Sequence, residues 1–176
     1  MENLEFMELE KENIEDLNEV VELINKAYRG KIQGNSWTGE AHLLSGIRIN
    51  LEMLKEYLQE KNTITYIAKI NNKVVGTIQT KLENEDIHIG LFAVSPNIQA
   101  SGVGKQLLEF AENSSKKLWN KNSFIIEVIS LRVELIEYYI RRGYKNTNTY
   151  MKFPKSQHWS QNIDEELKLL VLRKAL

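Results

Sequence analysis

The 176-residue sequence lacks or is poor in several residue types that specialised folds and sites require. It has no cysteine, which excludes a disulfide scaffold, a thiolate metal site and a cysteine nucleophile. Its three histidines, His42, His88 and His158, are scattered, so we expect no metal site. It has only two prolines, and no stretch rich in glycine, proline or serine marks a linker. We therefore expect one domain over residues 1–176.

Charge and hydropathy exclude further classes of protein. The 23 lysines and arginines nearly balance the 24 aspartates and glutamates, which argues against a general nucleic-acid-binding protein. No apolar run approaches the roughly 20 residues that a membrane span needs. The start of the chain, residues 1–5, is acidic and does not resemble a secretory signal. We therefore expect a cytoplasmic protein with no nucleic acid and no membrane as partner.

Hydrophobic periodicity predicts a mixture of helices and strands. Apolar residues recur at steps of three and four over 14–28, which is typical of one helix face, with Asn13 as the N-cap and Gly30 as the stop. Asn50 is the predicted cap of a second helix. We expect helices at 14–28, 51–58, 103–119 and 132–142, and strands at 6–9, 63–70, 73–82, 86–94, 123–129, 144–150 and 167–172.

The order of these elements predicts an α/β (α+β) fold. The three strands between 63 and 94 are joined by short turns at 71–72 and 83–85, so they form an antiparallel meander and not a series of βαβ units. The later strands alternate with helices. A mixed sheet with helices on its faces accommodates both parts.

A glycine-bearing loop between a buried strand and a helix is the most informative stretch. It follows Pro96 and contains Gln99-x-x-Gly102-x-Gly104. Unpaired backbone N–H groups and partial positive charge gather at a helix start, and glycines let the main chain approach a phosphate closely. The loop is therefore a candidate anion cradle, and glycines that serve turn geometry alone are the alternative.

Two phosphate-binding motifs do not fit this loop. A Walker loop needs serine or threonine after Gly104-Lys105, where the chain has Gln106. A dinucleotide fingerprint needs a small residue at the position of Leu107 and a parallel βαβ unit, which the meander does not provide.

The pattern Gln99-x-x-Gly102-x-Gly104, placed after Val94-x-Pro96, resembles the Gln/Arg-x-x-Gly-x-Gly/Ala motif of the GNAT superfamily of acyl-CoA-dependent N-acyltransferases. Segments at 27–30, 37–40 and 134–144 extend the resemblance over nearly the whole chain. It implies a GNAT-like mixed, mostly antiparallel central sheet of six to seven strands flanked by about four helices. Acetyl-CoA is the implied cosubstrate, without a metal.

The resemblance also implies the reaction. Members of the superfamily transfer an acetyl group from acetyl-CoA to a primary amine, usually by direct attack in a ternary complex, which suits a chain without cysteine. The acceptor is then the amine of a small molecule or a peptide. Homodimers are common in the superfamily, so a homodimer stays open as the assembly. The alternatives are a non-catalytic acyl-CoA-binding sensor or interaction module, and an unrelated α/β nucleotide-binding protein, which the meander disfavours.

The cofactor-binding residues follow from the resemblance. In the family the loop amides hold the pyrophosphate of coenzyme A, here those of Gln99, Ala100, Ser101, Gly102, Val103, Gly104 and Lys105. The backbone of Phe92, Ala93 and Val94 corresponds to the strand that receives the pantetheine arm. Gly90 inside this strand predicts a bulge or a close backbone approach, so we do not assign His88 and Phe92 to one face. Arg132 replaces an asparagine that contacts coenzyme A in many members. An arginine can reach a phosphate instead, and the alternative is a solvent-facing side chain without a cofactor contact.

Two residues are the candidates for catalysis. Tyr139 lies four residues before Gly143, as in the family's Tyr-x-x-x-Gly-Phe/Tyr pattern, and is the implied acid that protonates the departing thiolate; the alternative is packing in the core with Leu135. His88 lies eleven residues before Gln99, where histone-modifying members carry a catalytic glutamate, and is the candidate base. The alternative for His88 is a strand histidine without a catalytic role. The base is then ordered water or one of four carboxylates, Glu83, Glu85, Asp86 and Glu127.

The acceptor side is assigned to the region 28–48 and to the loop near Trp159. Aromatic residues there can wall a pocket, and Arg29 or Arg48 can pair with a substrate carboxylate, whereas Glu40 favours a cationic amine. The sequence does not decide between these charges. The predicted acceptor residues are Tyr28, Trp37, Arg48 and Trp159.

Overall fold

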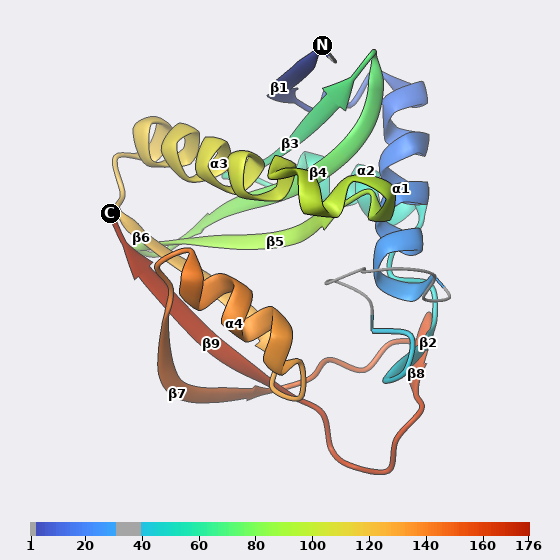
Figure 1. Ribbon diagram of the computed structural model, residues 1–176, viewed down its shortest axis with the longest axis vertical. Helices are drawn as coiled ribbons and strands as arrows, with labels where there is room; N and C mark the ends of the chain where they lie inside the picture. Colours follow the sequence, from blue (N-terminus) through green and yellow to red (C-terminus); the bar gives the residue numbers. More distant parts are fainter. Residues whose placement is uncertain (1–2, 31–39) are drawn as a thin grey trace.

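A seven-stranded sheet forms the centre of the protein, whose computed structural model describes residues 3–30 and 40–176 (Figure 1). The strand order is β1-β3-β4-β5-β6-β9-β7. All neighbours are antiparallel except β5 and β6, which are parallel. The strands are β1 (Leu4–Glu8), β3 (Thr63–Ile70), β4 (Lys73–Glu83), β5 (Asp86–Val94), β6 (Ser123–Ile129), β7 (Lys145–Lys152) and β9 (Lys168–Ala175). The predicted mixed, mostly antiparallel sheet is confirmed.

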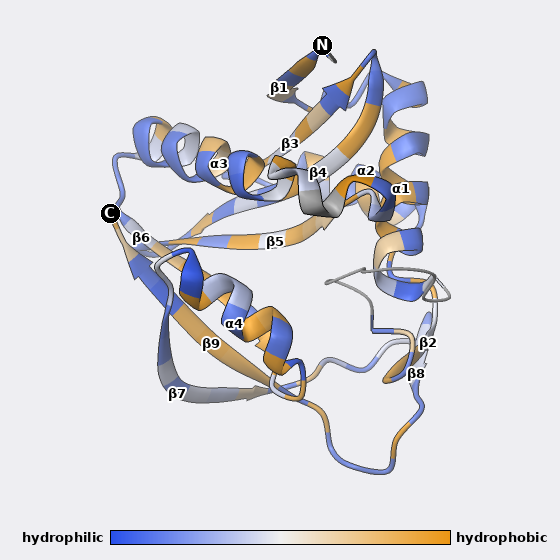
Figure 2. Cartoon of the chain, viewed as in Figure 1, coloured by the Kyte–Doolittle hydropathy of each residue, from blue (hydrophilic) through white to orange (hydrophobic). Residues whose placement is uncertain are grey.

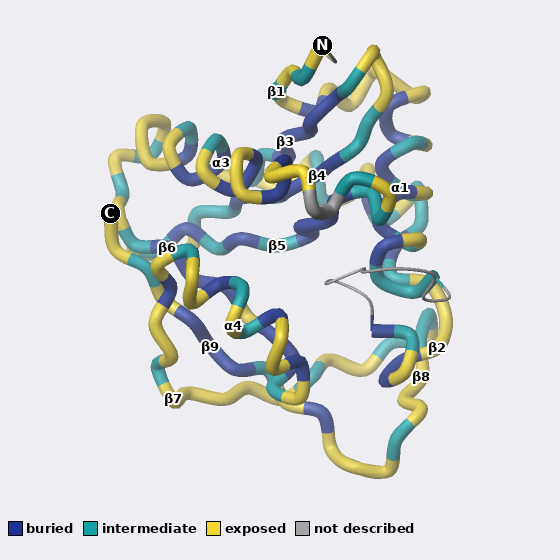
Figure 3. The backbone as a smooth tube through the Cα atoms, viewed as in Figure 1, coloured by how far each residue is buried: buried dark blue, intermediate teal, exposed yellow. Residues whose placement is uncertain are grey.

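Four α-helices of the described chain cover the two faces of this sheet. They are α1 (Ile14–Arg29), α2 (Leu51–Gln59), α3 (Val103–Trp119) and α4 (Val133–Arg141). One core cluster joins α1 and α2 to one face, with Leu17, Leu54 and Ile67 among its members. The other joins α3 and α4 to the opposite face, around Leu107 and Phe124. Apolar and buried segments therefore follow the inner strands and the inner sides of the helices, whereas the edge strand β7 is mostly exposed (Figures 2 and 3).

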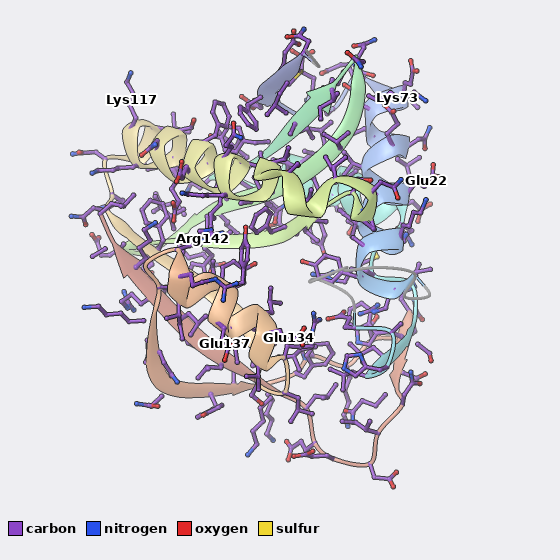
Figure 4. All side chains as sticks on the ribbon, viewed as in Figure 1. Glu22, Lys73, Lys117, Glu134, Glu137 and Arg142 are labelled. Carbon is purple, nitrogen blue, oxygen red and sulfur yellow. The ribbon has the colours of Figure 1, made fainter. Side chains whose placement is uncertain are left out.

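The two predicted helix caps are confirmed. The side chain of Asn13 accepts a hydrogen bond from the Asp16 N–H at 3.1 Å, and that of Asn50 accepts one from the Met53 N–H at 2.8 Å. Helix α1 ends at Gly30, where a Cβ atom would lie 2.3 Å from the Lys26 carbonyl oxygen. Outside the helix stripes the surface is charged, as Lys117 on α3 and Lys73 at the β3–β4 turn illustrate (Figure 4).

Tertiary pairing adds elements that periodicity did not predict. The three-residue strands β2 (Leu44–Gly46) and β8 (Trp159–Gln161) pair with each other in a separate small sheet. The loop before α3 contains a 3₁₀ helix, η1 (Pro96–Ser101). The last strand, predicted to end at 172, continues to Ala175 and lies between β6 and β7. No helix of the described residues combines the length and the apolar character that a membrane span requires.

Candidate active site

Strands β5 and β6 pair over a short stretch and then separate. Their register comprises three pairs, Ile87↔Phe124, His88↔Ile125 and Ile89↔Ile126. On its other edge β5 stays paired with β4 to its last residue, where Gly76 is opposite Val94. The second half of β5 therefore has β4 on one side and a space on the other.

A β-bulge lies where the two strands separate. Gln79 pairs with Gly90, but Thr77 pairs with Ala93, so β5 contains one residue more than β4 in this interval. Leu91 has a φ of 46°, in the left-handed region. The predicted irregularity near Gly90 is confirmed, and a Cβ atom at Gly90 would meet no atom within 4 Å.

The bulge changes which side chains of β5 share a face. Ile87 and Ile89 belong to the core cluster with α3 and α4, and after the bulge so does Phe92. His88 lies between the two isoleucines in sequence and opposite Lys81 in the ladder, so it points to the face of α1 and α2. His88 and Phe92 thus lie on different faces of the sheet.

A cavity of about 490 Å³ occupies the space between the separated strands. It opens to both faces of the sheet, because its lining includes Tyr57 of α2 and Leu135 of α4. Seven of the predicted site residues line it together: Tyr28, Arg48, His88, Phe92, Arg132, Tyr139 and Trp159. The topology therefore gathers the candidate catalytic and acceptor residues at one place.

The remaining predicted residues lie elsewhere. Ala93, Val94 and residues 101–105 are described but do not line this cavity. Gln99 and Ala100 belong to η1, and their side chains lie outside the part that the structure describes. Trp37 also falls outside the described residues. The glycine loop follows directly on β5, so the cavity and the loop are connected by one strand end.

Two tyrosine hydroxyls belong to the cavity. The Tyr28 hydroxyl donates a hydrogen bond to the Phe92 carbonyl at 2.8 Å, and burial raises the pKa of Tyr28 to about 12. Tyr139 is 4% exposed, and burial, with a smaller contribution from Tyr28, raises its pKa well above 10. Both phenols are therefore protonated near neutral pH and can act as proton donors.

Tyr139 also packs in the core. Its ring centroid lies 6.3 Å from that of Phe92 and 5.8 Å from that of Tyr144. The adjacent Tyr138 does not line the cavity; the Arg142 guanidinium lies 4.7 Å from its ring centroid, on the last turn of α4 (Figure 4). Tyr139 therefore packs in the core and also lines the cavity, and the packing of its ring restricts the position of its hydroxyl.

His88 lies at the other side of the cavity, next to charged neighbours. Its Nε2 atom lies 3.6 Å from Oε2 of Glu83, and its side chain is 29% exposed. The Lys81 ammonium, also in the cavity lining, pairs with Glu83 at 3.2 Å and with Glu60 at 3.0 Å. The imidazole therefore lies in the cavity wall beside a carboxylate and an ammonium group.

The glycine loop has the backbone geometry of an anion cradle. Gly102 has a φ of 83° and is the N-cap of α3, with no capping side chain. The nearest atom to a Cβ there would be Nε2 of Gln106 at 3.9 Å, so the left-handed backbone conformation, and not lack of space, requires glycine. The start of α3 therefore presents its backbone N–H groups without a side-chain cap.

Sequence analysis missed two polar lining residues of β4, Gln79 and Lys81. The observed turn leaves only residues 84–85 unpaired and so places Lys81 opposite His88, whereas the predicted turn at 83–85 would shift this register by one residue. Gln79 lies opposite Gly90 in the same register, so the predicted turn would shift its partner by one residue as well. Glu127 of β6, one of the carboxylates considered as an alternative base, also lines the cavity.

Comparisons with known proteins identify the family. Residues 38–159 match the Acetyltransferase (GNAT) domain, and the chain belongs to this family. It is 31% identical over 88 residues to an uncharacterized N-acetyltransferase of Methanocaldococcus jannaschii, an alignment that covers 50% of this chain and only 56% of that relative.

Solved structures agree in fold. The ribosomal-protein-S18-alanine N-acetyltransferase of Escherichia coli matches with a TM-score of 0.69 at 15% identity, over 98% of this chain and 94% of that chain. The PaiA N-acetyltransferase of Thermoplasma acidophilum, in complex with coenzyme A, matches with a TM-score of 0.69 at 17% identity over 99% of both chains.

Proposed function

We propose that this protein, as a single domain over residues 1–176, is an N-acetyltransferase. It transfers the acetyl group of acetyl-CoA to a primary amine of a small molecule or peptide, by direct attack in a ternary complex. Family membership supports the acetyltransferase class, and the structural relative with coenzyme A bound supports the cosubstrate. The observation that carries the proposal is the cavity between β5 and β6, which is lined by Tyr28, His88 and Tyr139 together.

The residues around the cavity and the loop fit acetyl-CoA. The uncapped start of α3 suits the pyrophosphate, held by backbone amides of residues 99–105. The backbone of Phe92, Ala93 and Val94, beyond the last β5–β6 pair, suits the pantetheine arm. Arg132, buried in the cavity wall, adds positive charge. Bound acetyl-CoA supplies an acetyl carbon activated as a thioester.

The chain's own side chains then manage the proton transfers. The acceptor ammonium must lose one proton before its nitrogen attacks and a second as the C–N bond forms and the C–S bond breaks, whereas the departing sulfur must gain one. His88, through water, accepts the first nitrogen proton and releases it to solvent. The Tyr139 hydroxyl donates the proton that sulfur gains and is restored by the second nitrogen proton, so one proton is released overall. Tyr28 has a different task, because its hydroxyl holds the Phe92 carbonyl and so positions the end of β5.

A thermal-unfolding titration tests cofactor binding. Acetyl-CoA and free coenzyme A should each raise the melting temperature, and ATP should not; a ligand at 100 times its Kd adds about 2.7 kcal/mol to the free energy of unfolding. An amine panel assayed by thiol release then tests transfer. The absence of any shift at millimolar acetyl-CoA contradicts the proposal. A shift without thiol release from any amine indicates a non-catalytic acyl-CoA-binding module.

Two glycine variants separate binding from backbone strain. Gly102→Ala and Gly143→Ala each place a side chain on a positive φ, 83° and 100°, so both should lower stability. Only Gly102→Ala should also weaken the acetyl-CoA shift, because Gly102 is at the start of α3. An equal weakening in both variants contradicts the role of the loop.

A further inference from the structure

The cavity wall formed by α1, Glu40, Arg48 and the start of α4 is rich in arginine. The guanidinium groups of Arg29, Arg48 and Arg132 line the cavity there, with Glu40 as the one carboxylate among them. These groups are close enough for the charges of all three arginines to act on the Glu40 carboxyl. The other two charged lining residues with fixed charge, Lys81 and Glu127, balance each other. The described part of this wall therefore carries three positive charges against one negative.

Glu40 is already engaged by one of these arginines. Its Oε1 atom lies 2.7 Å from Nη2 of Arg29, and the two side chains are only 8% and 5% exposed. A carboxylate held in a buried ion pair is a poor partner for an incoming ammonium group, because the new contact would compete with Arg29. Sequence analysis left open whether this region favours an anionic or a cationic group on the acceptor. The Arg29–Glu40 ion pair favours an anionic group.

The Arg29 side chain has donors that the ion pair with Glu40 does not use. Its Nε and Nη1 atoms are buried and have no hydrogen-bond partner among the described residues. Its guanidinium carbon lies 5.6 Å from the ring centroid of Trp159, which helps to fix the orientation of the group. Buried charged donors without acceptors carry a desolvation cost, so such groups usually have a ligand or water as partner.

Arg48 is also oriented toward this wall. Its guanidinium carbon lies 5.6 Å from the ring centroid of Tyr28. Its backbone N–H donates a 2.8 Å hydrogen bond to Oδ1 of Asn25, which fixes the chain at this point. Two arginines are therefore held by aromatic rings on one side of the cavity.

We infer that the acceptor amine also carries an anionic oxygen group, a carboxylate or a phosphate, which binds to the unpaired donors of Arg29 with Arg48 and Arg132 adding positive charge. This inference rests on the proposed acetyltransferase function. It excludes polyamines as preferred acceptors, because their additional ammonium groups would be repelled by the same wall.

Matched pairs of acceptors test the inference by thiol release. The pairs are glycine with glycinamide, and phosphoethanolamine with ethanolamine, so each anionic amine has a partner that lacks the anion. Spermidine is the cationic member of the panel. In the unsubstituted protein an anionic amine should exceed its partner in kcat/KM by about tenfold or more, mainly through a lower KM. Comparison of the ratios for the glycine pair and the phosphoethanolamine pair shows whether a carboxylate or a phosphate is recognised.

Variants show whether the arginines cause the preference. Arg29→Gln and Arg48→Gln should each reduce the ratio of kcat/KM within a pair toward one, and Arg29→Lys should reduce it less. Because Arg29→Gln leaves Glu40 buried without its partner, Arg48→Gln gives a readout that does not depend on folding of the first variant. Arg141→Gln removes an exposed arginine outside the cavity and should leave the ratio unchanged.

The outcomes distinguish this inference from the proposed function. Faster reaction of glycinamide, ethanolamine or spermidine than of the anionic amines overturns the inference and leaves the acetyltransferase intact. An unchanged ratio in both arginine variants overturns it as well, as does a complete lack of turnover with the anionic amines when acetyl-CoA still raises the melting temperature. Loss of that thermal shift instead contradicts the proposed function.

Discussion

Two buried ionic clusters of this protein differ in how completely they are satisfied. Under α3, both oxygens of Glu112 have donors: the Tyr144 hydroxyl at 2.8 Å and the Lys174 ammonium at 3.0 Å. In the cavity, Glu40 pairs with Arg29 at 2.7 Å, but two nitrogens of Arg29 have no partner among the described residues. Both clusters combine a carboxylate, a cation and a nearby tyrosine.

This difference in hydrogen bonding indicates a structural role for the Glu112 cluster and is consistent with the inferred binding role of the Arg29–Glu40 cluster. The Glu112 cluster joins α3 to β9 and to the residue before β7, and nothing about its geometry calls for a further partner. The cavity cluster leaves the Nε and Nη1 donors of Arg29 without a partner among the described residues, which fits the inferred anionic group. A fully satisfied buried network adds rigidity, whereas a partly satisfied one carries a cost that a ligand can remove.

The largest effect on stability is expected from the satisfied cluster. Glu112→Ala leaves the Tyr144 hydroxyl and the Lys174 ammonium without their acceptor, so the free energy of unfolding should fall by about 3–5 kcal/mol. Urea titration measures this change, with Glu109→Ala on the exposed side of α3 as the control. An equal loss in both variants would show that Glu112 contributes only as any residue of this helix does.

The largest effect on activity is expected in the cavity. Tyr139→Phe keeps the packed ring and removes the proton donor, so kcat should fall about 100-fold, as for other general acids. The thermal shift with acetyl-CoA should persist. Tyr138→Phe is the matched control, because its ring lies next to that of Tyr139 at 5.5 Å but outside the cavity. An unchanged kcat in Tyr139→Phe removes this residue from the mechanism.

Alkaline pH should affect the cavity through Tyr28. Its pKa of about 12 in the folded protein exceeds the value near 10 of an exposed tyrosine. The unfolded chain therefore loses this proton first, and the stability present below pH 10 is lost as the pH rises from 10 to 12. Two pKa units correspond to a loss of about 2.7 kcal/mol.

The measurement compares the pH dependence of the unfolding free energy between variants. Tyr28→Phe should lack this part of the alkaline decline, and Tyr150→Phe, at an exposed position, should retain it. If Tyr28→Phe declines as steeply as the unsubstituted protein, the Tyr28 hydroxyl is not held by burial and by Phe92 as described.

The smallest of these effects concerns the base. His88→Ala should lower kcat about tenfold at neutral pH and abolish the acidic limb of its rate–pH profile, since water or a carboxylate then accepts the proton less well. His42→Ala, at an exposed position, is the control. An acidic limb that persists in His88→Ala assigns the proton to another group, with Glu83 as the nearest carboxylate.

The local parts of the fold were predictable because local rules govern them. Apolar spacing and the caps Asn13 and Asn50 set the first two helices, and short turns set the meander. The glycine motif and the tyrosine motif identified the family, because each requires fixed residue types at fixed spacing. Gly90 indicated the bulge for the same reason, since a glycine inside an apolar strand needs an explanation.

The sequence by itself determined the four α-helices, the strands of the central sheet, the glycine loop and the family, all of which depend on residues within a few positions of one another. Only the tertiary structure decided the separation of β5 from β6, the insertion of β9 between β6 and β7, and the pairing of β2 with β8. It also decided which charged residues meet in the cavity wall. Whether Glu40 or the arginines can bind a further charged group depends on the Arg29–Glu40 ion pair and on Arg132. Arg132 lies more than 90 positions from Glu40 in sequence. Electrostatic partners are set by distance in space, and spacing along a chain does not encode that distance.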